Sequence, residues 1–182
     1  MPTDELGFDP IEEARRQWER RWPTAALPMA AATSIMRAQQ IVLHELDAAL
    51  RPVGLTFARF EALTLLSFSR AGALPIGKLG PRLMVHPTSV TNVIDRLEAQ
   101  GLVARRAHPT DRRMTMVAIT GPGRRALEVA TTAVNATRFG LGALDDTTLL
   151  QLVESIRTVR ESAGDVGVSS PASRGGSYGR DP

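Results

Sequence analysis

The chain contains 182 residues, of which 43% are hydrophobic and 23% are charged, a balance typical of a globular protein with one compact domain. It contains no cysteine, which excludes disulfides, thiolate metal ligands and cysteine nucleophiles. No apolar run reaches the ~18 residues of a membrane-spanning helix, and the first residues do not form a secretory signal, so we expect a cytoplasmic protein.

Positive charge is concentrated in the middle of the chain. The net charge is +3, and 21 of the 22 basic residues are arginine. Between residues 75 and 125, nine basic residues stand against three acidic ones, so this segment carries +6 and the remainder of the chain carries −3. Such a segment indicates an anionic partner, with nucleic acid as the first candidate and a solvated surface as the alternative.

The N-terminal segment predicts a helix over residues 9–22. Asp9 is the expected N-cap, Pro10 takes the first helical position, and Pro23 ends the helix. Apolar residues at spacings of three and four form one stripe, which consists of Ile11, Ala14, Trp18 and Trp22. We interpret residues 1–24 as an N-terminal extension helix that packs on other helices, and its two tryptophans are candidate ligand-binding residues.

Periodicity and breaking residues predict a mainly α fold with one small β-hairpin. The expected helices cover residues 29–51, 57–70, 76–83, 87–100, 122–139 and 145–163. The buried stripe of the last helix is expected to contain Leu149, Leu152, Val153, Ile156 and Val159. Two runs with a period of two, within residues 102–107 and 113–119, predict the hairpin. Residues 164–182 are rich in glycine, serine and proline, and we expect a disordered tail.

The helix expected over residues 87–100 has two contrasting faces. One face carries apolar residues within an arc of about 100°, the width of a buried stripe. The other side carries short polar residues and one arginine, namely Thr88, Ser89, Thr91, Asn92 and Arg96. Serine, threonine and asparagine are poor helix formers, and their concentration here favours a recognition helix whose short side chains reach base edges and phosphates. With the short helix before it, this helix predicts a helix-turn-helix motif.

The expected hairpin adds a second signal for DNA binding. Four arginines surround its turn, namely Arg105, Arg106, Arg112 and Arg113. Like charges at this density gain little in water, but beside a duplex they would replace counterions along the phosphate backbone. Asp111 is close enough to hold one of them by a charge-assisted hydrogen bond, so we assign it a supporting role. A charged turn that resists edge aggregation would explain only part of this charge.

The order of these elements and two motifs resemble the MarR family of winged helix-turn-helix regulators. The wing motif is Asp111-Arg112-Arg113 followed by Val117-x-Ile119-Thr120-x-x-Gly123. The recognition-helix motif is Ser89-Val90-Thr91-Asn92-x-x-Asp95-Arg96-Leu97-Glu98-x-x-Gly101-Leu102-Val103. The resemblance covers residues 29–162.

The resemblance implies a homodimeric, sequence-specific regulator of transcription, usually a repressor, on a pseudo-palindromic operator in double-stranded DNA. It implies release by a small effector, often phenolic or anionic. No cofactor is expected. Residues 56–120 would form the DNA-binding lobe, and residues 29–51 and 122–163 would supply the dimerisation helices. The positions that match DNA contacts are Thr88, Ser89, Thr91, Asn92 and Arg96 in the helix and Arg112 and Arg113 in the wing.

Two features depart from the usual pattern of the family. Gly80-Pro81 stands within the first helix of the motif, where proline removes an amide, so we expect a short or kinked helix. The N-terminal helix is an extension, and we expect it to pack on the dimerisation helices, across the partner subunit, and to roof a pocket.

Other function classes have weaker support in the sequence. The chain lacks HExxH, GxSxG, P-loop and GxGxxG patterns, which argues against an enzyme. His44, His86 and His108 fall on separate elements without metal-ligand spacing, so no metal site is expected. A winged-helix module that binds protein, or that coats DNA without sequence preference, stays open as the alternative.

Overall fold

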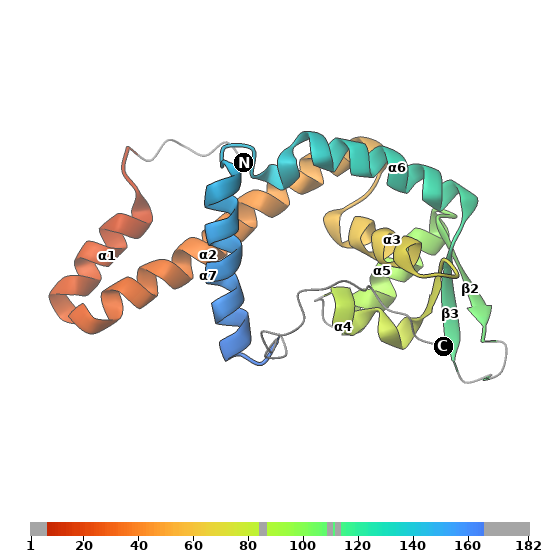
Figure 1. Cartoon of the computed structure of the whole chain (residues 1–182), viewed down its shortest axis with the longest axis horizontal. Helices are drawn as coiled ribbons and strands as arrows, with labels where there is room; N and C mark the ends of the chain where they lie inside the picture. The colour runs from red at the N-terminus through yellow and green to blue at the C-terminus, as the bar shows by residue number, and fades with distance from the viewer. Residues whose placement is uncertain (1–6, 84–86, 109–110, 112–113, 166–182) are drawn as a thin grey trace. The chain divides into compact units, whose positions relative to one another are not determined.

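The computed structural model describes residues 7–83, 87–108, 111 and 114–165, with the backbone alone described for residues 87–89. The expected tail therefore lies almost wholly outside the described residues. The chain divides into two compact units, residues 1–141 and 142–182. The α-helices in the described ranges are α1 (Pro10–Arg21), α2 (Pro23–Leu50), α3 (Phe57–Phe68), α4 (Gly80–Leu83), α5 (Pro87–Ala99), α6 (Gly121–Ala136) and α7 (Asp146–Ser162) (Figure 1). None of the helices described is long and apolar enough to cross a membrane.

Three short strands form an antiparallel sheet in the first unit. They are β1 (Ala73–Pro75), β2 (Val103–Ala107) and β3 (Thr115–Ile119), in the order β1-β3-β2. The pairing of β2 with β3 confirms the predicted hairpin. The sequence analysis missed β1, which has only three residues and ends in proline. As an edge strand it tolerates that proline.

The core of the first unit joins helices to the sheet. Leu46 and Leu50 of α2 are buried there, as are side chains of α3, α5, β3 and α6. In α5 the predicted apolar stripe is confirmed, because Val90, Ile94 and Leu97 are all buried. The core therefore fixes one face of α5 and directs the opposite face outward.

The first helix of the helix-turn-helix motif is interrupted, as Gly80-Pro81 predicted. A 3₁₀ turn, η2 (Ile76–Lys78), comes first, and α4 restarts at Gly80 with Pro81 in its first turn. Proline is tolerated there because amides of the first turn have no intrahelical partner. Leu79 and Leu83 remain buried, so the break does not detach this segment from the core.

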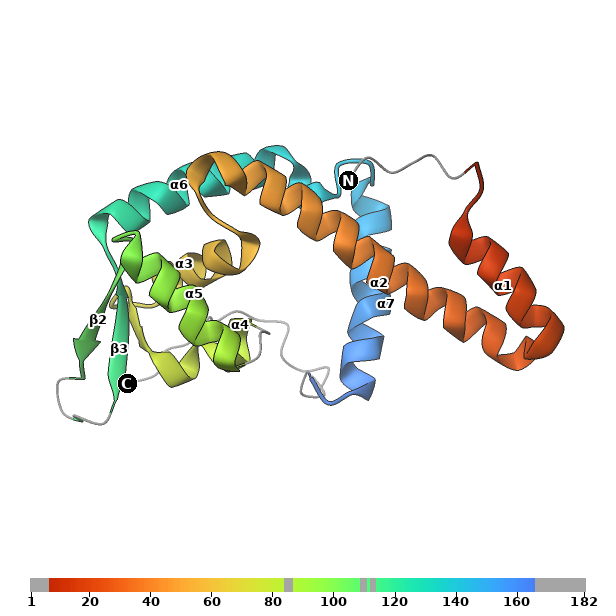
Figure 2. The same ribbon diagram turned by 180° about the vertical axis from the view of Figure 1, so that it is seen from behind.

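Helices α1 and α2 pack against each other at the N-terminal end of the chain (Figures 1 and 2). The carboxylate of Asp9 accepts a hydrogen bond from the Ile11 amide at 2.9 Å, which confirms the predicted N-cap. Helix α2 begins at Pro23 and continues through Pro28, so its expected start at residue 29 is wrong. Pro23 ends one helix and begins the next because proline suits the first helical turn.

The predicted apolar stripes of α1 and α7 are not fully buried in this chain. In α1, Trp18 is 37% exposed and Trp22 is 51% exposed, with ring centroids 4.9 Å apart. In α7, Val153 is 61% exposed, and no residue of the helix is buried. The described residues of its own unit therefore do not bury the predicted stripe of α7.

Candidate DNA-binding surface

The outward face of α5 carries the polar residues that the sequence analysis singled out. Thr91, Asn92 and Arg96 are exposed, on the opposite side of the helix from the buried stripe. The side chains of Thr88 and Ser89 lie outside the described residues, so their predicted role stays a prediction. In Figure 2, α5 lies at the front of its unit, with the β2–β3 hairpin beside it.

The end of α5 is fixed by a Schellman motif. Gly101 has φ of 71°, its amide donates to the Glu98 carbonyl at 2.8 Å, and the Leu102 amide donates to the Leu97 carbonyl at 2.9 Å. The left-handed conformation at Gly101 turns the chain directly from the helix into β2. The wing is therefore attached to the recognition helix through a short, specified connection.

Arg105 ties the wing to α5 a second time. Its guanidinium bonds the Asp95 carboxylate at 2.5 Å and also pairs with Glu98, while its backbone amide donates to the other Glu98 oxygen at 2.9 Å. The Arg105 amide, and then its guanidinium, hold the pKa of Glu98 below its usual range. We therefore assign Arg105 to the helix–wing connection, and not to the DNA contact expected for all four arginines of the hairpin.

The wing turn is described only in part. The His108 amide donates to the Met114 carbonyl at 3.2 Å, and the Asp111 amide donates to Nδ1 of His108 at 3.2 Å. These bonds keep the two strands together up to the turn. Arg112 and Arg113 lie outside the described residues, so neither their contacts nor their predicted pairing with Asp111 can be placed. Arg106 is exposed beside the turn.

A recess beside α5 adds residues that the sequence analysis missed. It measures about 410 Å³ and is lined by Thr56, Arg59, Asn92, Val93 and Arg96. Arg59 donates to Oγ1 of Thr56 and to Oε1 of Gln100, both at 3.3 Å. Two guanidinium groups thus share one polar hollow with the central asparagine of the predicted recognition face. Both Thr56 and Arg59 lie outside the segments that the sequence assigned to DNA contacts, and Arg59 stands 37 positions before Arg96.

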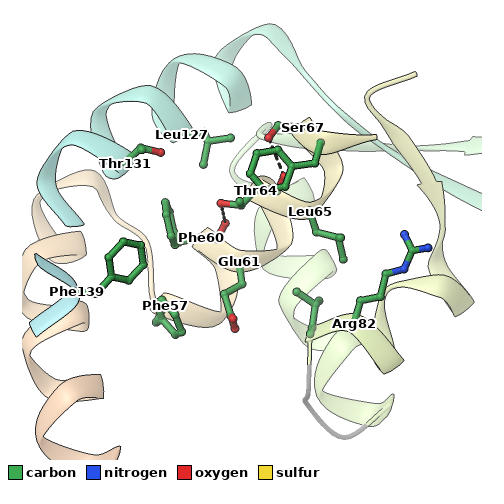
Figure 3. Close-up of a pocket in the computed structure, with 12 residues that line it drawn as sticks. Phe57, Phe60, Glu61, Thr64, Leu65, Ser67, Arg82, Leu127, Thr131 and Phe139 are labelled. Carbon is green, nitrogen blue, oxygen red and sulfur yellow. Dashed lines mark hydrogen bonds between the residues drawn. The ribbon is translucent and has the colours of Figure 1, made fainter. Parts of the chain in front are cut away.

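A second hollow, mostly apolar, lies between α3, α4, α6 and the 3₁₀ turn η3 (Arg138–Gly140) (Figure 3). Its volume is about 480 Å³, and its lining comprises Phe57, Phe60, Glu61, Thr64, Leu65, Ser67, Phe68, Arg82, Leu83, Leu127, Thr131 and Phe139. Burial raises the pKa of the Glu61 carboxyl above its usual range. Trp18 and Trp22 do not line this hollow, and their predicted ligand role stays a prediction. The described residues hold no cluster of three potential metal ligands.

Comparison with known proteins identifies the family. The model of the MarR family matches residues 55–115, the segment from the start of α3 to the start of β3. A solved structure of Sco5413, a MarR family transcriptional regulator from Streptomyces coelicolor, is 54% identical with a TM-score of 0.71, over 76% of this chain and 96% of that one. The chain belongs to the MarR family of transcriptional regulators.

Other relatives share the family at lower identity. MhqR from Bacillus subtilis is 33% identical over 89 residues, 49% of this chain and 60% of MhqR, which is less than two thirds of that relative. The repressor Rv2887 from Mycobacterium tuberculosis is 31% identical over 102 residues, 56% of this chain and 72% of that protein.

Two solved regulators in the comparison have named ligands. CouR from Rhodococcus jostii, bound to p-coumaroyl-CoA, is 27% identical with a TM-score of 0.63, over 76% of this chain and 95% of CouR. BpsR from Bordetella bronchiseptica, regulated by 6-hydroxynicotinic acid, is 25% identical with a TM-score of 0.65, over 71% of this chain and 92% of BpsR.

Proposed function

We propose that this MarR family protein is a ligand-responsive repressor that binds a pseudo-palindromic operator as a homodimer. The observation that carries the proposal is the exposed face of α5, where short polar side chains and Arg96 stand opposite a buried stripe and beside a basic wing. Short side chains allow a helix to lie deep in a major groove, where amide and hydroxyl groups distinguish bases. The relative Rv2887 is a transcriptional repressor, which supports repression as the direction of regulation.

The proposed contacts divide into base readout and phosphate binding. Asn92 lies at the centre of the exposed face and is assigned to a base edge, because its amide both donates and accepts. Arg96, Arg59 and the wing arginines Arg112 and Arg113 are assigned to phosphates, whose negative charge they neutralise. Thr88, Ser89 and Thr91 flank Asn92 on the same helix and are assigned to the groove and its rim, and Asp111 is assigned to the support of the wing.

The homodimer is supported by apolar side chains that are exposed on α7 and on α2. On α7, Leu152 and Val159 stand seven positions apart on one side of the helix and are 41% and 54% exposed. On α2, Met36 and Leu43 likewise stand seven positions apart and are 63% and 37% exposed. Apolar side chains repeated along two helices are more than the scattered exposure of a monomer, and they indicate a protein interface. A second copy is the proposed occupant, since two α5 helices could then enter successive major grooves.

The ligand response is supported by the hollow between α3 and α6. It adjoins α4, which leads into the recognition helix, so a ligand there would act on the position of α5. The regulators CouR and BpsR respond to, or bind, small organic molecules. A ligand that prefers the DNA-free arrangement would lower operator affinity by population shift.

A mobility-shift experiment tests the DNA-binding proposal. The DNA upstream of the protein's own gene and a random duplex of equal length are titrated with wild type and Asn92→Ala. We expect Asn92→Ala to weaken binding to the upstream DNA by about 1–3 kcal/mol and to change random-DNA binding little, because one base-edge contact is lost. Asn135→Ala, an exposed asparagine on α6, is the matched control.

The same titration distinguishes the proposed function from the two alternatives. Equal affinity of the wild type for both duplexes would indicate a protein that coats DNA without sequence preference. No binding to either duplex at low salt would indicate a module for protein interaction. Equal losses for Asn92→Ala on both duplexes would remove Asn92 from base readout.

A further inference from the structure

We infer that the hollow between α3, α4, α6 and η3 takes an aromatic ligand with a cationic nitrogen, and that Glu61 binds this nitrogen. The inference rests on the proposed ligand response, because it names the ligand class for the same hollow. It differs from the phenolic or anionic effectors that the family resemblance suggests.

The walls of the hollow favour an aromatic ligand. Four of the five phenylalanines of the chain line it, namely Phe57, Phe60, Phe68 and Phe139. The rings of Phe57 and Phe60 have centroids 6.1 Å apart and planes inclined by 31°. Aromatic faces attract both flat apolar rings and cations, because the face of each ring carries partial negative charge.

Glu61 is the acidic residue of these walls. Its carboxylate forms no hydrogen bond or ion pair with the described residues. Two of the three hydroxyls in the lining donate to backbone carbonyls, Thr64 to Phe60 at 2.9 Å and Ser67 to Thr64 at 2.7 Å, and the third, that of Thr131, forms no hydrogen bond with Glu61. A partly buried carboxylate without hydrogen bonds raises the free energy of the protein, because burial removes water from its charge. A bound cation would replace the lost interaction with water.

Arg82 does not supply that cation. It is the other charged residue of the lining, but it is exposed and forms no ion pair with Glu61. In Figure 3 its guanidinium is directed away from the phenylalanine rings. An anionic ligand among the rings would therefore meet the negative charge of Glu61 without a compensating positive group.

Three probes with the same ring and different charges test the inference. The full-length protein, without DNA, is titrated by calorimetry with 1-naphthylmethylammonium, 1-naphthylmethanol and 1-naphthoate at neutral pH. We expect the ammonium probe to bind at least about tenfold more tightly than the alcohol, and the naphthoate to bind least tightly, because hydrogen bonds between charged groups are the strong ones. The net charge of +3 opposes this order, so a preference for the cation must come from the local site.

Variants of Glu61 separate its charge from the shape of the hollow. Glu61→Gln should abolish the preference for the ammonium probe while leaving the affinity for the alcohol within about twofold, which also shows that the hollow is intact. Glu61→Asp should keep part of the preference because it keeps the charge. Glu128→Gln, an exposed carboxylate on α6 outside the hollow, should behave as wild type.

Several results would overturn the inference. They are equal affinities for the three probes, tighter binding of the naphthoate, an unchanged preference in Glu61→Gln, or no binding of the ammonium probe at millimolar concentration. Operator binding is measured separately on the same preparations. A protein that prefers the ammonium probe but binds no operator would contradict the proposed function and leave this inference standing. A protein that binds operator but does not prefer the ammonium probe would contradict this inference and leave the proposed DNA binding standing.

Discussion

Helices α5 and α7 are both amphipathic, but their apolar faces are treated differently in this chain. In α5, Ile94 and Leu97 are fully buried against α3 and the sheet, whereas in α7 Leu150 and Val153 are mostly exposed. An apolar stripe predicts that a face will be covered, but it does not say by which molecule. Helix α5 is therefore positioned by its own chain, whereas a partner covers α7 under the proposed function.

The largest change in free energy is expected for a substitution in the core that packs against α5. Leu97→Ala should lower the free energy of unfolding by about 4 kcal/mol, because a fully buried leucine leaves a cavity. Urea unfolding at fixed protein concentration measures the loss. Leu97→Met conserves volume and should cost less than about 1.5 kcal/mol. A loss under about 1 kcal/mol for Leu97→Ala would mean that α5 is not anchored by this stripe.

A charge on the exposed stripe of α7 should act on assembly instead. Val153→Asp should weaken dimerisation by about 3 kcal/mol, or roughly 100-fold in the dimer Kd, because it places a carboxylate in an apolar interface. Sedimentation equilibrium measures the Kd. Thr158→Asp, on the polar side of α7, should leave it nearly unchanged. A wild-type monomer, or an unaffected Val153→Asp dimer, would contradict the proposed role of α7.

The recess beside α5 should contribute to the salt dependence of DNA binding. Arg59→Ala should reduce the slope of log K against log salt by about 0.9 per monomer, because one phosphate contact is lost. Arg70→Ala, an exposed arginine just beyond α3, is the matched control. If the two variants give the same slope as wild type, Arg59 serves only its hydrogen bonds to Thr56 and Gln100.

The smallest change is expected in thermal stability, when the ion pair between α5 and the wing is removed. The pKa of Glu98 is lower in the folded protein than in the unfolded chain, first through the Arg105 amide and then through its guanidinium. The resulting stabilisation is present above the unfolded pKa and is lost as the pH falls through the folded pKa. On acidification, the Tm of wild type should therefore fall further than the Tm of Glu98→Gln. Parallel Tm profiles would show that this ion pair does not stabilise the fold.

The sequence predicted local features of single helices. Asp9 accepts a hydrogen bond as the expected N-cap of α1, because this role depends on residues within a few positions. The apolar periodicity of α5 likewise identified its buried face.

Contacts between residues that are far apart in the sequence could not be predicted from local patterns. The partners of Arg105 are seven and ten positions away on another element, and Arg59 reaches Gln100 across 41 positions. The three-residue strand β1 depends on pairing with β3 and has no periodicity of its own. The hollow around Glu61 arises only when α3, α4 and α6 are assembled.

The most direct test of the central claim is selection of bound duplexes from a random DNA pool by the wild-type protein. Two α5 helices that read one operator should enrich an inverted repeat, with half-sites about 10 base pairs apart from centre to centre. The same selection with Asn92→Ala should lose sequence information at one position of each half-site. A pool that stays random with wild type, although the duplexes are bound, would contradict sequence-specific recognition through α5.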